Sequence, residues 1–237
     1  MSSKKNKKIL FIADHASNYI PSSLKNLGLK KNQINSHIAY DVGAKELCIN
    51  LSNRLNSNYI IGEYSRLIID LNRGISDPTL IPEIVDRKII TKNLNLTNYD
   101  KKKRISEIYN KYHYKIKTAI KHYNIMTLIS LHSFNPIFKK RKRNIHFGIL
   151  SNQDRRLSDC IISEMKRRKL KVGDNEPYEG NLIGDTMYKH GLKNNLHHTL
   201  IEVRNDLLSS STKIHRVSVL LKQVINNSID RIKRQNE

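Results

Sequence analysis

Short runs of apolar residues that do not alternate with polar ones recur along this chain of 237 residues. The clearest of them lie at residues 7–13, 58–63, 67–71, 125–131, 145–150 and 199–203. Strands that are apolar at nearly every position are typical of sheets buried on both faces. Because segments with helical periodicity separate these runs, we expect an α/β fold with helices on both sides of one sheet.

Helices are expected at residues 38–55, 100–123, 155–169 and from 209 onward. In the first of these, Val42, Leu47 and Leu51 fall on one stripe, as in a helix that packs on a core. No internal repeat is visible, and the length allows one large domain. We therefore expect a single domain over residues 1–237, with frayed ends at 1–6 and 230–237.

Two of the apolar runs end in a histidine. His15 follows the first run, His132 follows the run at 125–131, and a proline closes the turn after each. The last run carries Glu202 into a similar position. Ligands gather at the carboxyl ends of strands in open α/β sheets, so we expect these three side chains to meet at one edge of the sheet.

Asp41 stands near the beginning of the helix expected at 38–55. It either caps that helix by accepting backbone N–H bonds or points its carboxylate into the site. The residues alone leave both roles open.

Arg66, Asp70 and Arg73 surround the apolar run at 67–71. Arginine pairs bidentately with carboxylates, so these residues could hold an acidic substrate. Alternatively, Asp70 pairs with an arginine and only stabilises a strand end. The following segment, to about residue 99, is irregular and could form a flap over the site.

A hydrolytic zinc site needs three protein ligands, commonly two histidines and a carboxylate, and an open position for water. The chain offers candidates for every part: His15 and His132 as imidazoles, Asp41 or Asp14 as the carboxylate, Glu202 as the base, and Arg66 or Arg73 as the cation. In the alternative interpretation the two histidines only hydrogen-bond loop backbones. His113 lies on the helix expected at 100–123. A single histidine on a helix is more often part of the core than a ligand.

The chain is strongly basic, with 43 Lys and Arg against 21 Asp and Glu and a net charge of +22. Such a charge attracts polyanions or steers acidic small molecules. The basic residues are scattered, however, and the one dense cluster, at 139–143, has no aromatic residue interleaved with it. We interpret this cluster as a solvated loop and do not expect the chain to bind nucleic acid.

Cys48 and Cys160 lie within helical patterns and are expected to be small buried side chains. No apolar run approaches the roughly 18 residues of a membrane span. The basic start is followed by too short an apolar run for a signal peptide. A cytoplasmic protein that binds no membrane is therefore expected, and the oligomeric state stays open.

Six blocks of the sequence together resemble the N-formylglutamate amidohydrolase family. They are HASNYIP at 15–21, DVGAKEL at 41–47, SRLIIDLNR at 65–73, LHSFNP at 131–136, VGDNEPY at 172–178 and IEVRND at 201–206. The resemblance runs from about residue 9 to 208. It implies a phosphorylase/hydrolase-like, three-layer α/β/α sandwich around a mixed, mostly parallel sheet, distantly similar to zinc carboxypeptidases.

The resemblance also implies roles for single residues. It assigns zinc binding to His15 and His132, the substrate α-carboxylate to Asn72 and Arg73, oxyanion support to Arg66, and activation of water to Glu202. Arg204 and His113 are further candidates for substrate binding, and His113 and Gly180 are expected near the rim of the pocket.

One position departs from the carboxypeptidase pattern. Those enzymes carry a ligand glutamate three residues after the first histidine, where this chain has Asn18. Asp41 is therefore the expected third ligand, with Asn18 and Asp14 as alternatives. The function implied is a zinc-dependent amidohydrolase that cleaves the amide of a small N-acyl acidic amino acid such as N-formylglutamate. The alternative is an inactive family member that binds acidic ligands or nucleic acid through its positive charge.

Overall fold

A six-stranded sheet forms the centre of the molecule, in the order β2-β1-β5-β10-β8-β9. The computed structural model describes residues 8–235, so the fraying expected at 1–6 lies outside the described residues. The strands are β1 (Ile9–Ala13), β2 (Asn58–Ile61), β5 (Thr127–Phe134), β8 (Phe147–Leu150), β9 (Val172–Asp174) and β10 (His197–Arg204). All neighbouring strands pair in parallel except β8 and β10. The expected mixed, mostly parallel sheet is confirmed.

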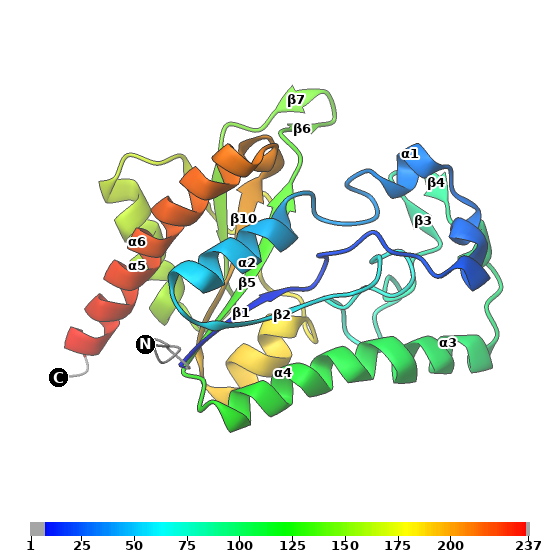
Figure 1. The fold of residues 1–237 in the computed structure, drawn as a ribbon, viewed down its shortest axis with the longest axis horizontal. Coiled ribbons are helices and arrows are strands. Elements are labelled where there is room, and N and C mark those ends of the chain that lie inside the picture. Colours follow the sequence, from blue (N-terminus) through cyan, green and yellow to red (C-terminus); the bar gives the residue numbers. More distant parts are fainter. Residues whose placement is uncertain (1–7, 236–237) are drawn as a thin grey trace.

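Helices cover both faces of the sheet (Figure 1). One face packs against α2 (Ala44–Arg54), α5 (Arg156–Arg167) and α6 (Ser211–Gln235). The other packs against one long helix made of α3 (Asn98–Arg104), a π-helical turn (Ile105–Tyr109) and α4 (Asn110–His122). Successive strand residues such as Leu10 and Phe11 belong to opposite cores, because side chains alternate along a strand. The uninterrupted apolar runs thus follow from the three-layer α/β/α architecture.

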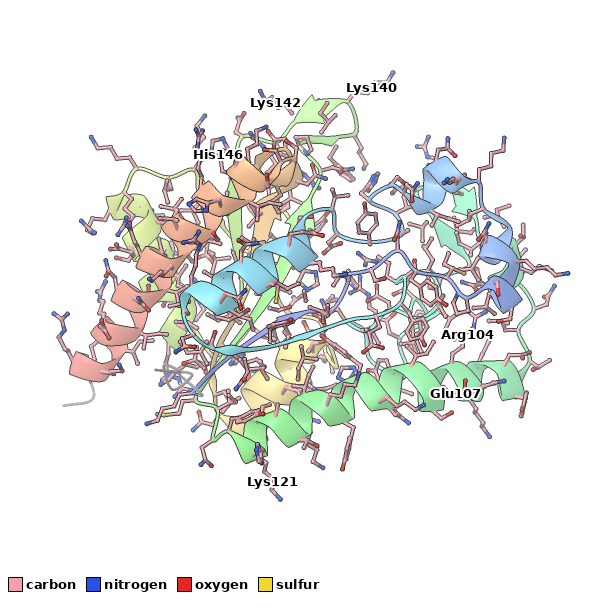
Figure 2. The ribbon with its side chains drawn as sticks, in the orientation of Figure 1. Arg104, Glu107, Lys121, Lys140, Lys142 and His146 are labelled. Atoms are coloured by element: carbon pink, nitrogen blue, oxygen red, sulfur yellow. The ribbon has the colours of Figure 1, made fainter. Side chains whose placement is uncertain are left out.

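The apolar run at 67–71 is not a strand, contrary to expectation. Its residues are buried but form turns outside the sheet. Side chains satisfy its backbone carbonyls instead: Asn93 Nδ2 donates to Leu67 O at 2.7 Å, and Arg104 Nη1 donates to Ile68 O at 2.8 Å. Figure 2 shows Arg104 reaching from the long helix toward this part of the molecule, whereas Glu107 points away from it. Buried backbone groups need partners, and here distant polar residues provide them.

Helix α2 begins at Ala44, later than the expected start at residue 38. Gly43 takes the N-cap position with a left-handed φ of 79°, and no side chain caps the helix. A Cβ at Gly43 would also lie 2.5 Å from Leu208 Cβ. Asp41 therefore does not cap this helix, and that interpretation is wrong.

Two small hairpins project from the fold (Figure 1). They are β3 (Ile84–Val85) with β4 (Lys88–Ile89), and β6 (Ile137–Phe138) with β7 (Arg141–Lys142). The shorter helical elements are Ser22–Gly28, α1 (Lys31–Ile34), Thr91–Asn93, Met187–Gly191, Leu192–Asn194 and Asn205–Leu208. Within residues 8–235, no helix is both long enough and apolar enough to span a bilayer. Both cysteines are buried and unpaired, as expected.

Candidate metal centre and its cavity

The sheet register brings together the two histidines and Glu202. His15 lies two residues beyond the end of β1, and His132 in β5 is paired directly with Glu202 in β10. Paired residues on neighbouring strands point to the same face. The rings of His15 and His132 are 4.9 Å apart between centroids, at 84° to each other.

Asp41 completes a compact set of three possible metal ligands. Ligand atoms of His15, Asp41 and His132 all lie within 4.8 Å of one another, and all three residues are buried. Asp41 Oδ2 is 2.8 Å from His132 Nδ1 and 3.5 Å from His15 Nδ1. His15 Nδ1 has no hydrogen-bond partner among the described residues. These contacts leave the Nδ1 atoms of both rings directed toward one carboxylate oxygen.

The far side of the His132 ring is fixed by Asp14. His132 Nε2 donates to Asp14 Oδ2 at 3.0 Å, because a carboxylate can only accept here. Asp14 also accepts hydrogen bonds from the hydroxyls of Ser130, Tyr112 and Thr186, at 2.9, 3.0 and 2.6 Å. Asp14 is therefore bound on all sides and supports the histidine from behind.

Asp70 does the same for His15. His15 Nε2 lies 2.7 Å from Asp70 Oδ1, which also accepts from the backbone N–H of Asn72 at 2.9 Å. The other oxygen of Asp70 accepts from Arg66 Nη2 at 2.7 Å. Asp70 thus orients the ring of His15 and also pairs with Arg66. The ion pair expected from the sequence is therefore one of its two side-chain contacts.

These donors suit a zinc ion. With each Nε2–H donated to a carboxylate, Nδ1 is the nitrogen that each ring can offer to a metal, and a set of two imidazoles and one carboxylate is a common hydrolytic zinc site. Carboxylates that accept from the opposite ring nitrogen are typical neighbours of such ligands. The buried, unpartnered Nδ1 of His15 is the observation that best fits a cation in this place.

The charge states agree with this arrangement. Burial opposes ionisation of Asp41, but the charge of His15 and the hydrogen bond from His132 hold the pKa of Asp41 well below its usual range. Burial likewise opposes the charged form of His132, yet its hydrogen bonds to Asp14 and Asp41 raise the pKa of His132 well above its usual value. Without a metal, a proton must bridge His132 Nδ1 and Asp41, and a divalent cation can replace that proton.

Glu202 differs from the neighbouring carboxylates. It is buried, and its Oε2 has no hydrogen-bond partner among the described residues. Burial raises the pKa of Glu202 to about 7, with a further contribution from the charge of Asp41. A carboxyl group with a pKa near neutrality can exchange protons at physiological pH, as a general base and acid must.

A cavity of about 1550 Å³ opens over these residues. His15, Asp41, His132 and Glu202 line it, together with Arg66, Asn72, Arg73 and Gly180. Both hairpins contribute to its wall. Most of the residues expected at the site therefore share one cavity.

Three expected residues lie elsewhere. Arg204 pairs with Asp206 through Nε at 2.8 Å and Nη2 at 3.1 Å, and it is not on the cavity wall. His113 is buried and is not on the cavity wall; its Nδ1 lies 2.9 Å from His190 Nε2. Asn18 donates to Asn35 instead of facing the ligand set. Geometry gives none of the three a place in the centre.

The sequence interpretation missed the supporting groups around the ligands. Asp14 precedes His15 directly and was considered only as a ligand. Thr186 and Ser130 carried no recognisable signal, because their role depends on contacts with a distant carboxylate. The cluster at 139–143 is also not free of aromatic contacts, since Arg143 lies among three aromatic rings. Two of those rings come from other parts of the chain, so spacing alone could not reveal them.

Comparisons with known proteins agree with the fold and identify a family. The N-formylglutamate amidohydrolase family profile matches residues 7–209. The fold is similar to the crystal structure of a gene product from Agrobacterium tumefaciens, with a TM-score of 0.92 and 27% identity, covering 97% of this chain and 93% of that one. It is also similar to an N-formylglutamate amidohydrolase from Ralstonia eutropha JMP134, with a TM-score of 0.72 and 16% identity over 98% and 96% of the two chains. No curated protein sequence matches. Because the family match covers most of its length, the chain belongs to the N-formylglutamate amidohydrolase family.

Proposed function

We propose that this chain is a zinc-dependent amidohydrolase that cleaves the amide bond of a small N-acyl acidic amino acid such as N-formylglutamate. Family membership supports hydrolysis of amides. The observation that carries the proposal is the convergence of His15, Asp41 and His132 within 4.8 Å, in a cavity that Glu202 also lines.

The residues that would hold the metal are His15 and His132, through their Nδ1 atoms, and Asp41, through its carboxylate. When bound there, zinc supplies Lewis acidity to the acyl carbonyl and to water. Asp14 and Asp70 accept the Nε2–H groups of the two rings, so Nδ1 is the nitrogen of each ring that remains for a metal. Without the proton between His132 Nδ1 and Asp41, the protein presents two neutral imidazoles and one negative carboxylate to the metal.

Glu202 is the proposed general base and acid. In its deprotonated form it removes a proton from the attacking water, and it then delivers that proton to the leaving amine. Its burial and its pKa of about 7 suit both steps. Its position opposite His132 in the sheet holds it beside the metal ligands.

Arginine side chains on the cavity wall serve the charged parts of the substrate. Arg73 makes no ion pair among the described residues; its Nε donates to Thr79 and its Nη1 to the carbonyl of Asn72. It is the proposed partner of the α-carboxylate, together with Asn72. Arg66, held by Asp70, is the proposed support for the developing oxyanion.

Metal analysis and a hydrolysis assay test this function. We expect one equivalent of zinc per chain and release of formate from N-formylglutamate. Glu202→Gln should retain the zinc and lose activity by roughly 10²- to 10⁴-fold. Glu107→Gln, on the exposed side of the long helix (Figure 2), is the matched control and should be fully active. A chain that binds no zinc, or a Glu202→Gln variant with full activity, would contradict the proposal.

A further inference from the structure

Arg143 stands on the cavity wall in an unusual setting. Its guanidinium lies 5.4 Å from the ring centroid of Phe134, 4.8 Å from that of Phe138 and 5.2 Å from that of Tyr178. These distances are within the range of cation–π contacts. Phe134 is buried, whereas Phe138 and Tyr178 are 53% and 47% exposed, so these rings place the guanidinium at the open side of the cavity.

One edge of this guanidinium has no partner. Nη1 donates to Asn135 O at 3.2 Å and lies 3.4 Å from the Tyr178 hydroxyl. Nε and Nη2 have no hydrogen bond to any residue of the described chain, and Arg143 makes no ion pair there. These two nitrogens form a planar fork that matches a carboxylate bidentately.

The charge balance of the cavity points to the same conclusion. Four arginines line it: Arg66, Arg73, Arg87 and Arg143. Arg66 is already paired with Asp70, and Arg87 is exposed at the turn of its hairpin. Arg73 and Arg143 remain as partly buried arginines of the wall that form no ion pair within residues 8–235.

Arg143 and Tyr178 line the same cavity as Glu202 and the candidate metal ligands. The cavity, at about 1550 Å³, has room for a substrate that extends from Arg143 to the metal ligands.

We propose that Arg143 is the specificity-determining residue that binds a second carboxylate of the substrate, at the end of its side chain. This inference rests on the proposed function, in which Arg73 holds the first carboxylate. It assigns a residue to the second negative charge of the acidic substrate, and it gives a role to the one basic residue of the 139–143 cluster that lies near three aromatic rings. Lys140 and Lys142 extend outward from the same hairpin (Figure 2).

The test compares N-formylglutamate with N-formylglutamine, which has nearly the same shape but lacks the second charge. The zinc-loaded wild type should prefer N-formylglutamate in kcat/KM by about 10- to 100-fold, the range of a charge-assisted hydrogen-bonded pair. Arg143→Met should remove that preference by lowering kcat/KM for N-formylglutamate alone. Arg143→Lys should restore part of it.

Arg141→Met is the matched control, because Arg141 is exposed on the same hairpin and is not on the cavity wall. It removes the same charge and should keep the full preference. A merely structural role of Arg143 would lower the rates for both substrates equally, and that result overturns the inference, as does a wild type without preference.

Failure of the proposed function is distinguishable from failure of this inference. If the wild type hydrolyses neither compound, the binding of both is measured by calorimetry on the wild type and on Arg143→Met. Tighter binding of N-formylglutamate that depends on Arg143 still supports the inference. Equal binding of the two compounds overturns it.

Discussion

The two halves of the metal centre are built in different ways. His132 and Glu202 lie on β5 and β10, where eight consecutive residue pairs fix their relative position. Asp41 and Asp70 lie on irregular segments, and side-chain hydrogen bonds hold the 67–71 segment in place. One half is positioned by backbone pairing and the other by a few polar side chains. The second half should therefore be easier to displace by mutations far from the site.

The largest expected effect is removal of a ligand from either half. His132→Ala and Asp41→Ala should each lose the bound zinc, and hydrolysis should fall by at least about 10³-fold. Zinc content after dialysis and the rate of formate release measure this. If Asp41→Ala keeps stoichiometric zinc, the irregular segments supply no metal ligand through Asp41, and the metal centre is not built from two halves.

Removing the support behind a ligand should have a smaller effect. Asp14→Asn releases His132, and Asp70→Asn releases His15, so each should weaken zinc affinity by about 10- to 100-fold. Competition with a chelator measures the affinity. Saturating zinc should restore most of the activity of Asp14→Asn. Asp70→Asn should remain slower, because Asp70 also holds Arg66. Equal recovery of both variants would show that Arg66 needs no such anchor.

The pH dependence tests the strand-borne half. The pKa of Glu202 is raised to about 7, and its deprotonated form is the base. The active fraction therefore increases as pH rises through that value. The kcat/KM of the zinc-saturated enzyme should fall about tenfold per pH unit below it. A profile that is flat between about pH 6 and pH 8 would contradict the assigned role.

The smallest effect is expected from Arg104, whose hydrogen bonds hold the irregular 67–71 segment in place. Arg104→Met leaves the carbonyl of Ile68 and the side chain of Asn93 without their donor, so the free energy of unfolding should fall by about 1–3 kcal/mol. Zinc affinity should also drop by a few-fold. Thr199→Val is the control in the strand half, where Thr199 and Ser158 are joined by a buried hydrogen bond. It should cost stability without changing zinc affinity. Equal losses of zinc affinity in both variants would show that the irregular half is no easier to displace than the strand half.

The same division explains what could be predicted from the sequence. The sheet, its two helical layers and the meeting of His15, His132 and Glu202 follow from apolar periodicity and from the rule that parallel strands end at one edge. The 67–71 run has the same composition as a strand, and only Asn93 and Arg104 show where its backbone bonds go. Asp41 resembled a helix cap because it lies near the expected start of the helix, but the helix begins at Ala44 and Gly43 occupies the N-cap position. Side-chain contacts between distant segments leave no periodic signal.

The most direct test of the metal centre is a crystal structure of the zinc-loaded protein with anomalous scattering measured at the zinc edge. We expect one peak, enclosed by His15 Nδ1, His132 Nδ1 and the carboxylate of Asp41, with Asp14 and Asp70 still bound to the opposite ring nitrogens. A peak on the Nε2 side of either ring, or no peak between the two histidines, would contradict it.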